Sequence, residues 1–124
     1  MAKKKILIVD DETSITDMLK ISLAKAGGFD VRVENKGADA LKAARDFKPD
    51  LIFLDVMMPD LDGGEVANRI KADPAVSGTP VVFMTAAVTK DEVDSQANTI
   101  GGYPFLAKPV SLQEIVACIR KFAR

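Results

Sequence analysis

Four short apolar runs in this 124-residue chain each end at a residue with a charged or hydroxyl side chain. The runs cover residues 6–9, before Asp10 and Asp11; residues 51–54, before Asp55; residues 81–84, before Thr85; and residues 105–107, before Lys108. A continuous apolar run of this length is typical of a strand buried on both faces, as in a parallel sheet. Because parallel strands end at the same edge of their sheet, we expect these five side chains to meet there.

Stretches with helical periodicity separate the apolar runs, which indicates repeated βα units and a parallel sheet. A fifth strand is expected at residues 29–34. Helices are expected at residues 14–26, 38–47, 64–72, 90–100 and 111–123. The predicted fold class is therefore α/β, with one domain over residues 1–124 in which five helices cover a five-stranded parallel sheet.

The expected helices differ in the strength of their sequence signals. The helix at 14–26 has an apolar stripe made of Ile15, Met18, Leu19 and Leu23. The helix at 111–123 has the clearest start, because Ser111 and Glu114 have the spacing of a capping box. The helix at 90–100 is the least amphipathic, and we expect it to be loosely held.

Composition excludes several classes of function. The net charge of −1 disfavours direct binding to nucleic acid. The chain has no histidine, which excludes Ser-His and Cys-His nucleophile pairs and histidine-based zinc sites, and Cys118 is its only cysteine and has no partner for an internal disulfide. No apolar run approaches the roughly 20 residues of a membrane helix, and the run after Lys5 is too short for a signal peptide. We therefore expect a cytoplasmic protein that neither inserts into a membrane nor binds nucleic acid.

Three of the strand-end residues, Asp10, Asp11 and Asp55, are carboxylates. Clustered carboxylates repel one another and raise each other's pKa unless a cation lies among them. A hard divalent ion with oxygen ligands suits such a cluster, so Mg²⁺ is the expected cofactor.

Each strand-end residue also has an ordinary structural interpretation. Asp10 and Asp11 could begin a helix, Asp55 could start a turn, Thr85 could be a strand residue without a further role, and Lys108 could lie on the surface. These separate interpretations do not explain why all five residues follow successive strands.

Four stretches together resemble the receiver domain of response regulators in two-component signalling, including the free-standing chemotaxis-type receivers. The stretches are ILIVDDE, DLIFLDVMMPDLDGGEV, TPVVFMTA and GGYPFLAKP, and the resemblance covers essentially the whole chain. It implies a flavodoxin-like, doubly wound sandwich with strand order 2-1-3-4-5. It also implies a cis peptide bond between Lys108 and Pro109, since only X-Pro bonds adopt cis at low cost.

The resemblance also implies a role for each site residue. Asp55 is the expected phosphoacceptor, and Mg²⁺ is expected to bind Asp10, Asp11, Asp55 and the backbone carbonyl of Met57, with Asp11 as a direct ligand. Lys108 is expected to pair with Asp55 or its phosphoryl oxygens, while Thr85 and Phe105 occupy the family's switch positions.

The same resemblance implies a signalling switch that catalyses only its own phosphotransfer and autodephosphorylation. A histidine kinase or a phosphotransfer protein is the expected phosphodonor of what we expect to be a monomer. A protein target is expected to bind the face formed by the fourth helix, the fifth strand and the fifth helix.

The chain departs from the common receiver pattern beside the site. Met57 and Ala87 stand two residues after Asp55 and Thr85, where many receivers carry polar side chains, and Phe105 replaces the common tyrosine. Neither Met57 nor Ala87 can orient the hydrolytic water. We therefore expect a longer-lived acyl phosphate, and faster loss in a Met57→Asn, Ala87→Glu double mutant.

Two other functions are compatible with strand-end chemistry. A haloacid-dehalogenase-like phosphatase uses an aspartate nucleophile and Mg²⁺, but it would need a second acid where this chain has Met57. A flavodoxin-like cofactor module would need a phosphate loop after the first strand, where the acidic residues 10–12 would repel a phosphate. Turnover of phosphate esters or a yellow colour would identify these alternatives.

Overall fold

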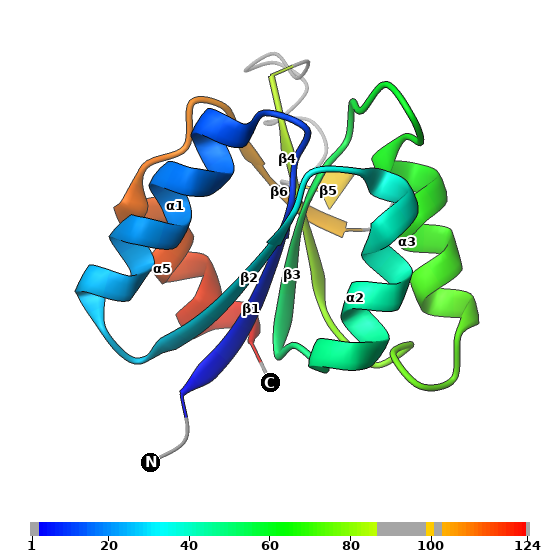
Figure 1. The fold of residues 1–124 in the computed structure, drawn as a ribbon, viewed down its shortest axis with the longest axis horizontal. Helices are drawn as coiled ribbons and strands as arrows, with labels where there is room; N and C mark the ends of the chain where they lie inside the picture. Colours follow the sequence, from blue (N-terminus) through cyan, green and yellow to red (C-terminus); the bar gives the residue numbers. More distant parts are fainter. Residues whose placement is uncertain (1–2, 87–98, 101–102, 124) are drawn as a thin grey trace.

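A parallel sheet forms the centre of the molecule (Figure 1). The structure is a computed structural model that describes residues 3–86, 99–100 and 103–123. The parallel strands are β1 (Lys4–Val9), β2 (Phe29–Glu34), β3 (Leu51–Asp55), β4 (Val81–Thr85) and β6 (Tyr103–Ala107). Their spatial order is β2-β1-β3-β4-β6, which is the predicted order 2-1-3-4-5 of the five parallel strands. The predicted fold class is confirmed.

Helices cover both faces of this sheet. They are α1 (Thr13–Ala26), α2 (Ala40–Phe47), α3 (Gly63–Ala72) and α5 (Leu112–Phe122), with a short 3₁₀ helix, η1 (Gly37–Asp39), before α2. Figure 1 shows α1 and α5 on one face and α2 and α3 on the other. Each face therefore has its own apolar core.

The two cores follow from the alternation of side chains along the strands. Leu7, Val9, Ile52 and Leu54 point to the α2–α3 side, while Ile6, Ile8, Leu51 and Phe53 point to the α1–α5 side. All eight side chains are fully buried, which explains why β1 and β3 read as continuous apolar runs.

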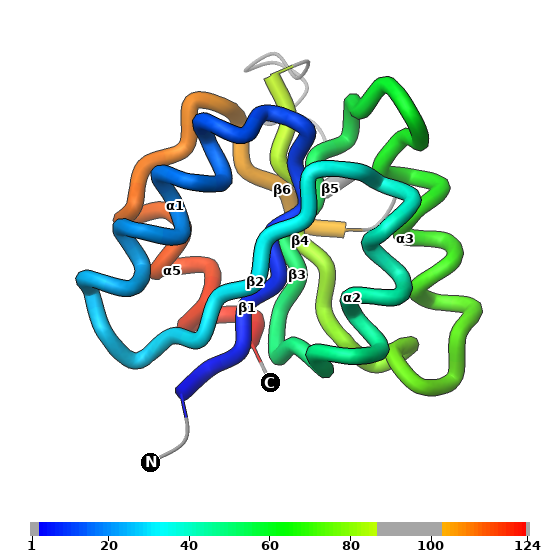
Figure 2. The backbone as a smooth tube through the Cα atoms, viewed as in Figure 1, coloured from blue at the N-terminus to red at the C-terminus, as the bar shows by residue number. Residues whose placement is uncertain are grey.

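Strand register sets which residues meet at the carboxyl edge of the sheet. Val9 of β1 lies opposite Leu54 of β3, so Asp10 and Asp55 follow paired residues. On the other side, Thr85 pairs with Ala107, so Lys108 is the first residue beyond that pair. In Figure 2, β1 begins and α5 ends near the bottom of the view, and the carboxyl ends of the strands lie at the opposite edge.

The capping box of α5 and the cis bond are as predicted. The Ser111 hydroxyl accepts a hydrogen bond from the Glu114 N–H, and the Glu114 carboxylate accepts one from the Ser111 N–H. The Lys108–Pro109 peptide bond is cis.

The helix predicted at 90–100 is wrong at its end, where Thr99–Ile100 forms the short strand β5. β5 pairs antiparallel with β6, with Ile100 opposite Tyr103 and Thr99 opposite Pro104. This pairing with a neighbouring strand outweighed the helical spacing of apolar residues. The remainder of that prediction, residues 90–98, lies outside the described residues, and the described part of the chain contains four α-helices rather than the predicted five.

The predicted apolar stripe on α1 is wrong at one residue, which the structure shows to be exposed. Met18 is 45% exposed, whereas Leu19 and Leu23 are fully buried and Ile15 packs against their cluster. At 3.6 residues per turn, Met18 lies about 120° from the centre of that buried face. Thr16 lies on the buried face instead.

Candidate functional site

The carboxyl edge of the sheet brings together the acidic residues predicted from the sequence. Asp10 is fully buried and Asp55 is 3% exposed, while Asp11 is half-buried. One carboxylate oxygen from each of these three residues lies within 4.8 Å of the other two. This spacing is within the reach of a single cation with oxygen ligands.

Lys108 joins this acidic cluster from the end of β6. Its ammonium lies 2.7 Å from Asp10 Oδ2, 3.5 Å from Asp55 Oδ2 and 3.3 Å from Glu12 Oε1. The backbone contributes to its placement, because the Lys108 N–H donates to the Thr85 carbonyl at 2.9 Å. Lys108 is therefore a largely buried cation shared by three carboxylates, two from the loop after β1 and one from the end of β3.

The two oxygens of the Asp10 carboxylate have different partners. Oδ1 accepts a hydrogen bond from the Glu12 N–H at 2.9 Å. Oδ2 is buried and ion-paired with Lys108 at 2.7 Å, and because an oxygen with two lone pairs can accept more than one contact, it can also bind a cation. A buried carboxylate oxygen normally has a hydrogen-bond partner, a water or an ion. The three carboxylates therefore fit an oxygen-coordinated divalent cation.

Burial and charge shift the acid–base equilibria of the site. Burial, followed by the charge of Asp10, raises the pKa of Asp55 to about 7, although Lys108 and the Met57 N–H oppose the shift. Burial opposes charge on Lys108 as well, but its contacts with Asp10 and Asp55 outweigh that effect and raise its pKa. Lys108 is consequently held as an ammonium. This positive charge beside Asp55 favours the ionised carboxylate of Asp55.

Thr85 and Phe105 lie on the neighbouring strands β4 and β6. Thr85 is buried as the last residue of β4, and Phe105 is buried in β6 opposite Phe83. Phe105 belongs to the core cluster on the α2–α3 side. Both predicted switch residues therefore occupy strands next to the acidic cluster.

The loop after β3 begins at Val56 and carries Met57. The Met57 N–H donates to Asp55 Oδ1 at 3.3 Å, and its side chain is 65% exposed. Ala87, the other departure from the receiver pattern, lies outside the described residues.

Three residues with no predicted role support the acidic pair. Asn35 Nδ2 donates to the Asp10 carbonyl at 2.8 Å and to the Thr16 hydroxyl at 2.9 Å. Glu12 contacts Lys108, as described above. Asn35 could have been found by the rule that found the acids, since it directly follows strand β2. The burial of Thr16 in a helix had no comparable signal.

Two further residues fix the loop between β3 and α3. The Asp60 carboxylate accepts hydrogen bonds from the Gly37 N–H at 3.2 Å and the Ala38 N–H at 3.0 Å, and these bonds lower its pKa. A Cβ atom at Gly63 would lie 2.4 Å from the Asp55 carbonyl oxygen. The loop therefore packs directly against the backbone of Asp55.

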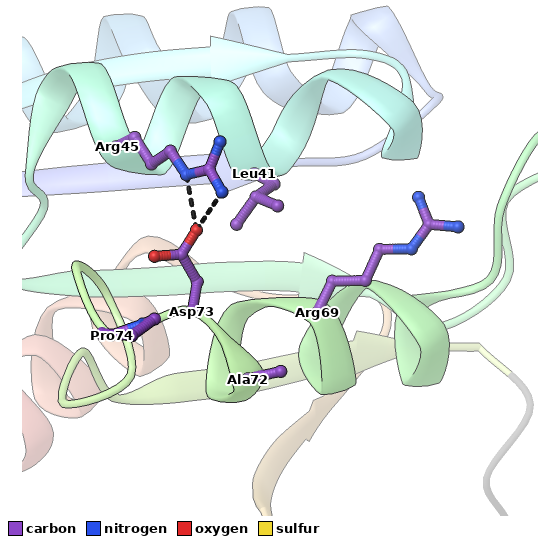
Figure 3. Close-up of a pocket in the computed structure, with 6 residues that line it drawn as sticks. All are labelled: Leu41, Arg45, Arg69, Ala72, Asp73 and Pro74. Carbon is purple, nitrogen blue, oxygen red and sulfur yellow. Dashed lines mark hydrogen bonds and ion pairs between the residues drawn. The ribbon is translucent and has the colours of Figure 1, made fainter.

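A separate open pocket lies between α2 and α3, at the end of α3 away from the acidic cluster (Figure 3). It has a volume of about 340 Å³ and is lined by Leu41, Arg45, Arg69, Ala72, Asp73 and Pro74. The Arg45 guanidinium bonds the Asp73 carboxylate across it. Because that ion pair connects the ends of α2 and α3, we interpret this region as structural.

Comparison with known proteins gives the family of this fold and site. The family model described as "Response regulator receiver domain" matches residues 6–120. The chain belongs to the response regulator receiver domain family. The match includes both acidic strand ends and Lys108, so the receiver fold and the acidic edge come from one family pattern.

Relatives of this receiver domain include a DNA-binding response regulator and a transcriptional regulatory protein. The chain is 39% identical over 119 residues to the "DNA-binding response regulator MtrA" of Mycolicibacterium paratuberculosis, covering 95% of this chain and 50% of that protein. It is 38% identical over 122 residues to the "Alkaline phosphatase synthesis transcriptional regulatory protein PhoP" of Bacillus subtilis, covering 98% and 49%. The chain thus spans about half the length of these relatives.

A solved structure matches the receiver over its whole length. The chemotaxis protein CheY4 of Vibrio cholerae has a TM-score of 0.82 and 26% identity, covering 98% of this chain and 99% of that one.

Among the helices that the structure describes here, none has the length and apolar character needed to cross a membrane.

Proposed function

We propose that this receiver is a phosphorylation-dependent signalling switch in which Asp55 accepts a phosphoryl group. The observation that carries this proposal is the position of the Lys108 ammonium, 2.7 Å from Asp10 and 3.5 Å from Asp55, in a buried cluster of three carboxylates. A nucleophilic carboxylate next to a fixed cation is suited to phosphoryl transfer, because that reaction depends on positioning and on charge stabilisation.

The proposed reaction uses Asp55 as the nucleophile. A carboxylate oxygen of Asp55 attacks the phosphorus of the donor, the bond from phosphorus to the donor atom breaks, and an acyl phosphate forms. Lys108 stabilises the negative charge on the phosphoryl oxygens, and its short contact with Asp10 holds it in place before the reaction. Hydrolysis of the acyl phosphate by water restores the Asp55 carboxylate.

We propose Mg²⁺ as the cofactor, held by Asp10, Asp11, Asp55 and the Met57 carbonyl. The burial of Asp10 and the spacing of the three carboxylates support this assignment. When bound, the ion supplies positive charge to the transferring phosphoryl group. Asp10 is ordered for this role by its hydrogen bond with the Glu12 N–H.

Thr85 and Phe105 are proposed to connect the site to the outer surface. Thr85 is proposed to bond the phosphoryl group through its hydroxyl, and Phe105 to change its packing as Thr85 moves. The Lys108 N–H and the Thr85 carbonyl share a hydrogen bond, which links the ends of β4 and β6 and supports this coupling. Phosphorylation adds charge of about −1.5 to −2, enough to reposition nearby donors.

The proposed donor is a histidine kinase or a phosphotransfer protein in the cytoplasm, and the proposed output is altered binding to a protein partner. The relatives named above are DNA-binding and transcriptional regulators roughly twice the length matched here. For this domain we propose a role in signalling, without an enzymatic activity beyond its own phosphotransfer and dephosphorylation.

The proposal is tested by incubating the protein with acetyl phosphate and Mg²⁺ and measuring the intact mass. The wild type should gain one phosphoryl group that hydroxylamine removes, as expected of an acyl phosphate. Asp55→Asn should gain none, because an amide is not a nucleophile. Asp50→Asn is the control, since Asp50 lies immediately before β3, at the opposite edge of the sheet. Wild-type labelling of Asp55→Asn would refute the assignment.

The phosphatase and flavodoxin-like alternatives are not favoured. Residue 57, where a dehalogenase-like phosphatase would need an acid, is a methionine with an exposed side chain. The acidic residues after β1 lie at the carboxyl edge, where a flavin phosphate would meet repulsion.

A further inference from the structure

Among the methionines that the structure describes, only two present their thioethers to solvent. Met84 is fully buried and Met58 is 8% exposed, whereas Met18 is 45% and Met57 is 65% exposed. Exposed methionines oxidise to the sulfoxide more readily than buried ones. Met57 is the more exposed of the two and lies beside the acidic cluster.

The position of Met57 connects it to Asp55. It is two residues away along the chain, and its N–H donates to Asp55 Oδ1 at 3.3 Å. Its side chain lines an open cavity of about 440 Å³ together with Val56, Met58, Pro59 and Asp62. Oxidants and water reach this cavity from solvent, so a change in the polarity of Met57 alters the surroundings of the site.

We propose that Met57 is a peroxide-sensitive modification site whose sulfoxide shortens the lifetime of phosphorylated Asp55. This inference rests on the proposed function of Asp55. The oxidant is a hydroperoxide such as hydrogen peroxide.

The modification is a two-electron oxidation. A sulfur lone pair attacks one peroxide oxygen, the O–O bond breaks and an S–O bond forms. The second oxygen leaves as water after a proton moves to it from the oxygen that is now bonded to sulfur. Sulfur loses two electrons and the peroxide is reduced. The thioether sulfur of methionine is a weak hydrogen-bond acceptor. The sulfoxide product carries a strongly polar oxygen on that sulfur.

The expected effect on Asp55 follows from the geometry of hydrolysis. Water must attack the phosphorus in line with the leaving carboxylate, and a group that orients this water lowers the barrier. The thioether sulfur of Met57 is only a weak hydrogen-bond acceptor for this water, whereas the sulfoxide oxygen is a strong one. One such hydrogen bond should accelerate loss of phosphate by about two- to tenfold.

The first part of the test is the order of oxidation. The protein carries Cys118→Ser, since a free thiol also reacts with peroxide. After limited treatment with hydrogen peroxide, peptide mass spectrometry should find sulfoxide at Met57 before Met58 and Met84. Oxidation of Met84 as early as Met57 would overturn the inference before any phosphorylation is measured.

The second part measures the decay of the phosphorylated protein after removal of acetyl phosphate. In a Met18→Leu background, peroxide should accelerate decay two- to tenfold, and methionine sulfoxide reductase should restore the original rate. In Met57→Leu, where Met18 remains, peroxide should leave the rate unchanged. Equal decay before and after oxidation of Met57 would overturn the inference, while failure of the untreated protein to take up phosphate would instead refute the proposed function.

Discussion

Asp10 takes part in the site through its side chain and in the packing of the site through its backbone. Its carboxylate contacts Lys108, while its carbonyl accepts a hydrogen bond from Asn35 at 2.8 Å. Asn35 also donates to Thr16, whose hydroxyl donates to the Thr13 carbonyl at 3.1 Å. A single amide therefore connects the end of β2, the loop after β1 and the first turn of α1.

Asn35→Ala should weaken binding of Mg²⁺ by about tenfold, because groups that support metal ligands typically contribute tenfold or more to affinity. Isothermal titration calorimetry measures the affinity. Asn68→Ala provides a matched control, since Asn68 is exposed on α3. Equal affinities of the two variants would show that Asn35 does not position the acidic pair.

Gly63 lies against the backbone of Asp55, where a side chain does not fit. The Cβ of alanine would stand 2.4 Å from the Asp55 carbonyl oxygen and 2.8 Å from Val56 Cα. At the adjacent Gly64, the nearest atom is a side-chain oxygen of Asp62 at 3.2 Å, which can move.

Gly63→Ala should therefore lower the free energy of unfolding by about 1–3 kcal/mol and slow phosphorylation from acetyl phosphate, because the overlap displaces the Asp55 backbone. Gly64→Ala should change stability by about 1 kcal/mol or less, since alanine favours the helix. Urea unfolding and labelling rates test both variants. A Gly63→Ala protein as stable and as reactive as Gly64→Ala would contradict this packing.

At the scale of elements, α2 and α3 are joined by the Arg45–Asp73 ion pair (Figure 3). Asp73 also accepts a hydrogen bond from the Ala75 N–H at 2.9 Å. This bond, followed by the contacts with Arg45, lowers the pKa of Asp73. The carboxylate is thus stabilised more in the folded state than in the unfolded state.

The contribution of Asp73 to stability should depend on pH. A lowered pKa means that the contribution is fully present above the unfolded value of about 4 and is lost as the pH falls through the folded value. Asp73→Asn should therefore be less stable than the wild type at pH 7, and the difference should shrink below pH 4. Urea unfolding at several pH values measures it. A difference that stays constant down to pH 2 would contradict the assignment.

At the scale of the whole molecule, the site joins both cores of the sandwich. Phe105 of β6 belongs to the core on the α2–α3 side, whereas Leu106 packs on the α1–α5 side. Lys108 directly follows the end of β6 and connects this strand to the acidic cluster. A shift of β6 toward the phosphorylated site would therefore reach the surface near α5.

We accordingly expect the output surface to include β6 and α5, whereas the fourth helix of the sequence prediction lies largely outside the described residues. Amide chemical-shift changes on phosphorylation should concentrate on β6 and α5, because a few kcal/mol are enough to shift the populations of two conformations of this surface. The same changes should be absent in Asp55→Asn, which cannot be phosphorylated. Changes concentrated on α1 and α2 instead would place the output surface elsewhere.

The sequence alone determined the five parallel strands, their order through the receiver pattern, and the residues at their carboxyl ends. Strand β2 has the predicted bounds, β4 consists of the apolar run at residues 81–84 together with Thr85, and the Ser111 capping box is present. These features are local, because apolar periodicity and cap residues act within a few positions along the chain. Predicting which residues meet at the strand ends required only one further rule, namely that the carboxyl ends of parallel strands lie at the same edge of their sheet.

The tertiary structure alone decided the contacts between segments that are distant in the sequence. Asn35 and Asp60 act on the backbone of other loops, and Lys108 divides its contacts among three carboxylates. Thr99 and Ile100 became a strand because β6 offered a partner. No local pattern encodes these outcomes, since each depends on how separate loops and strands pack together in space.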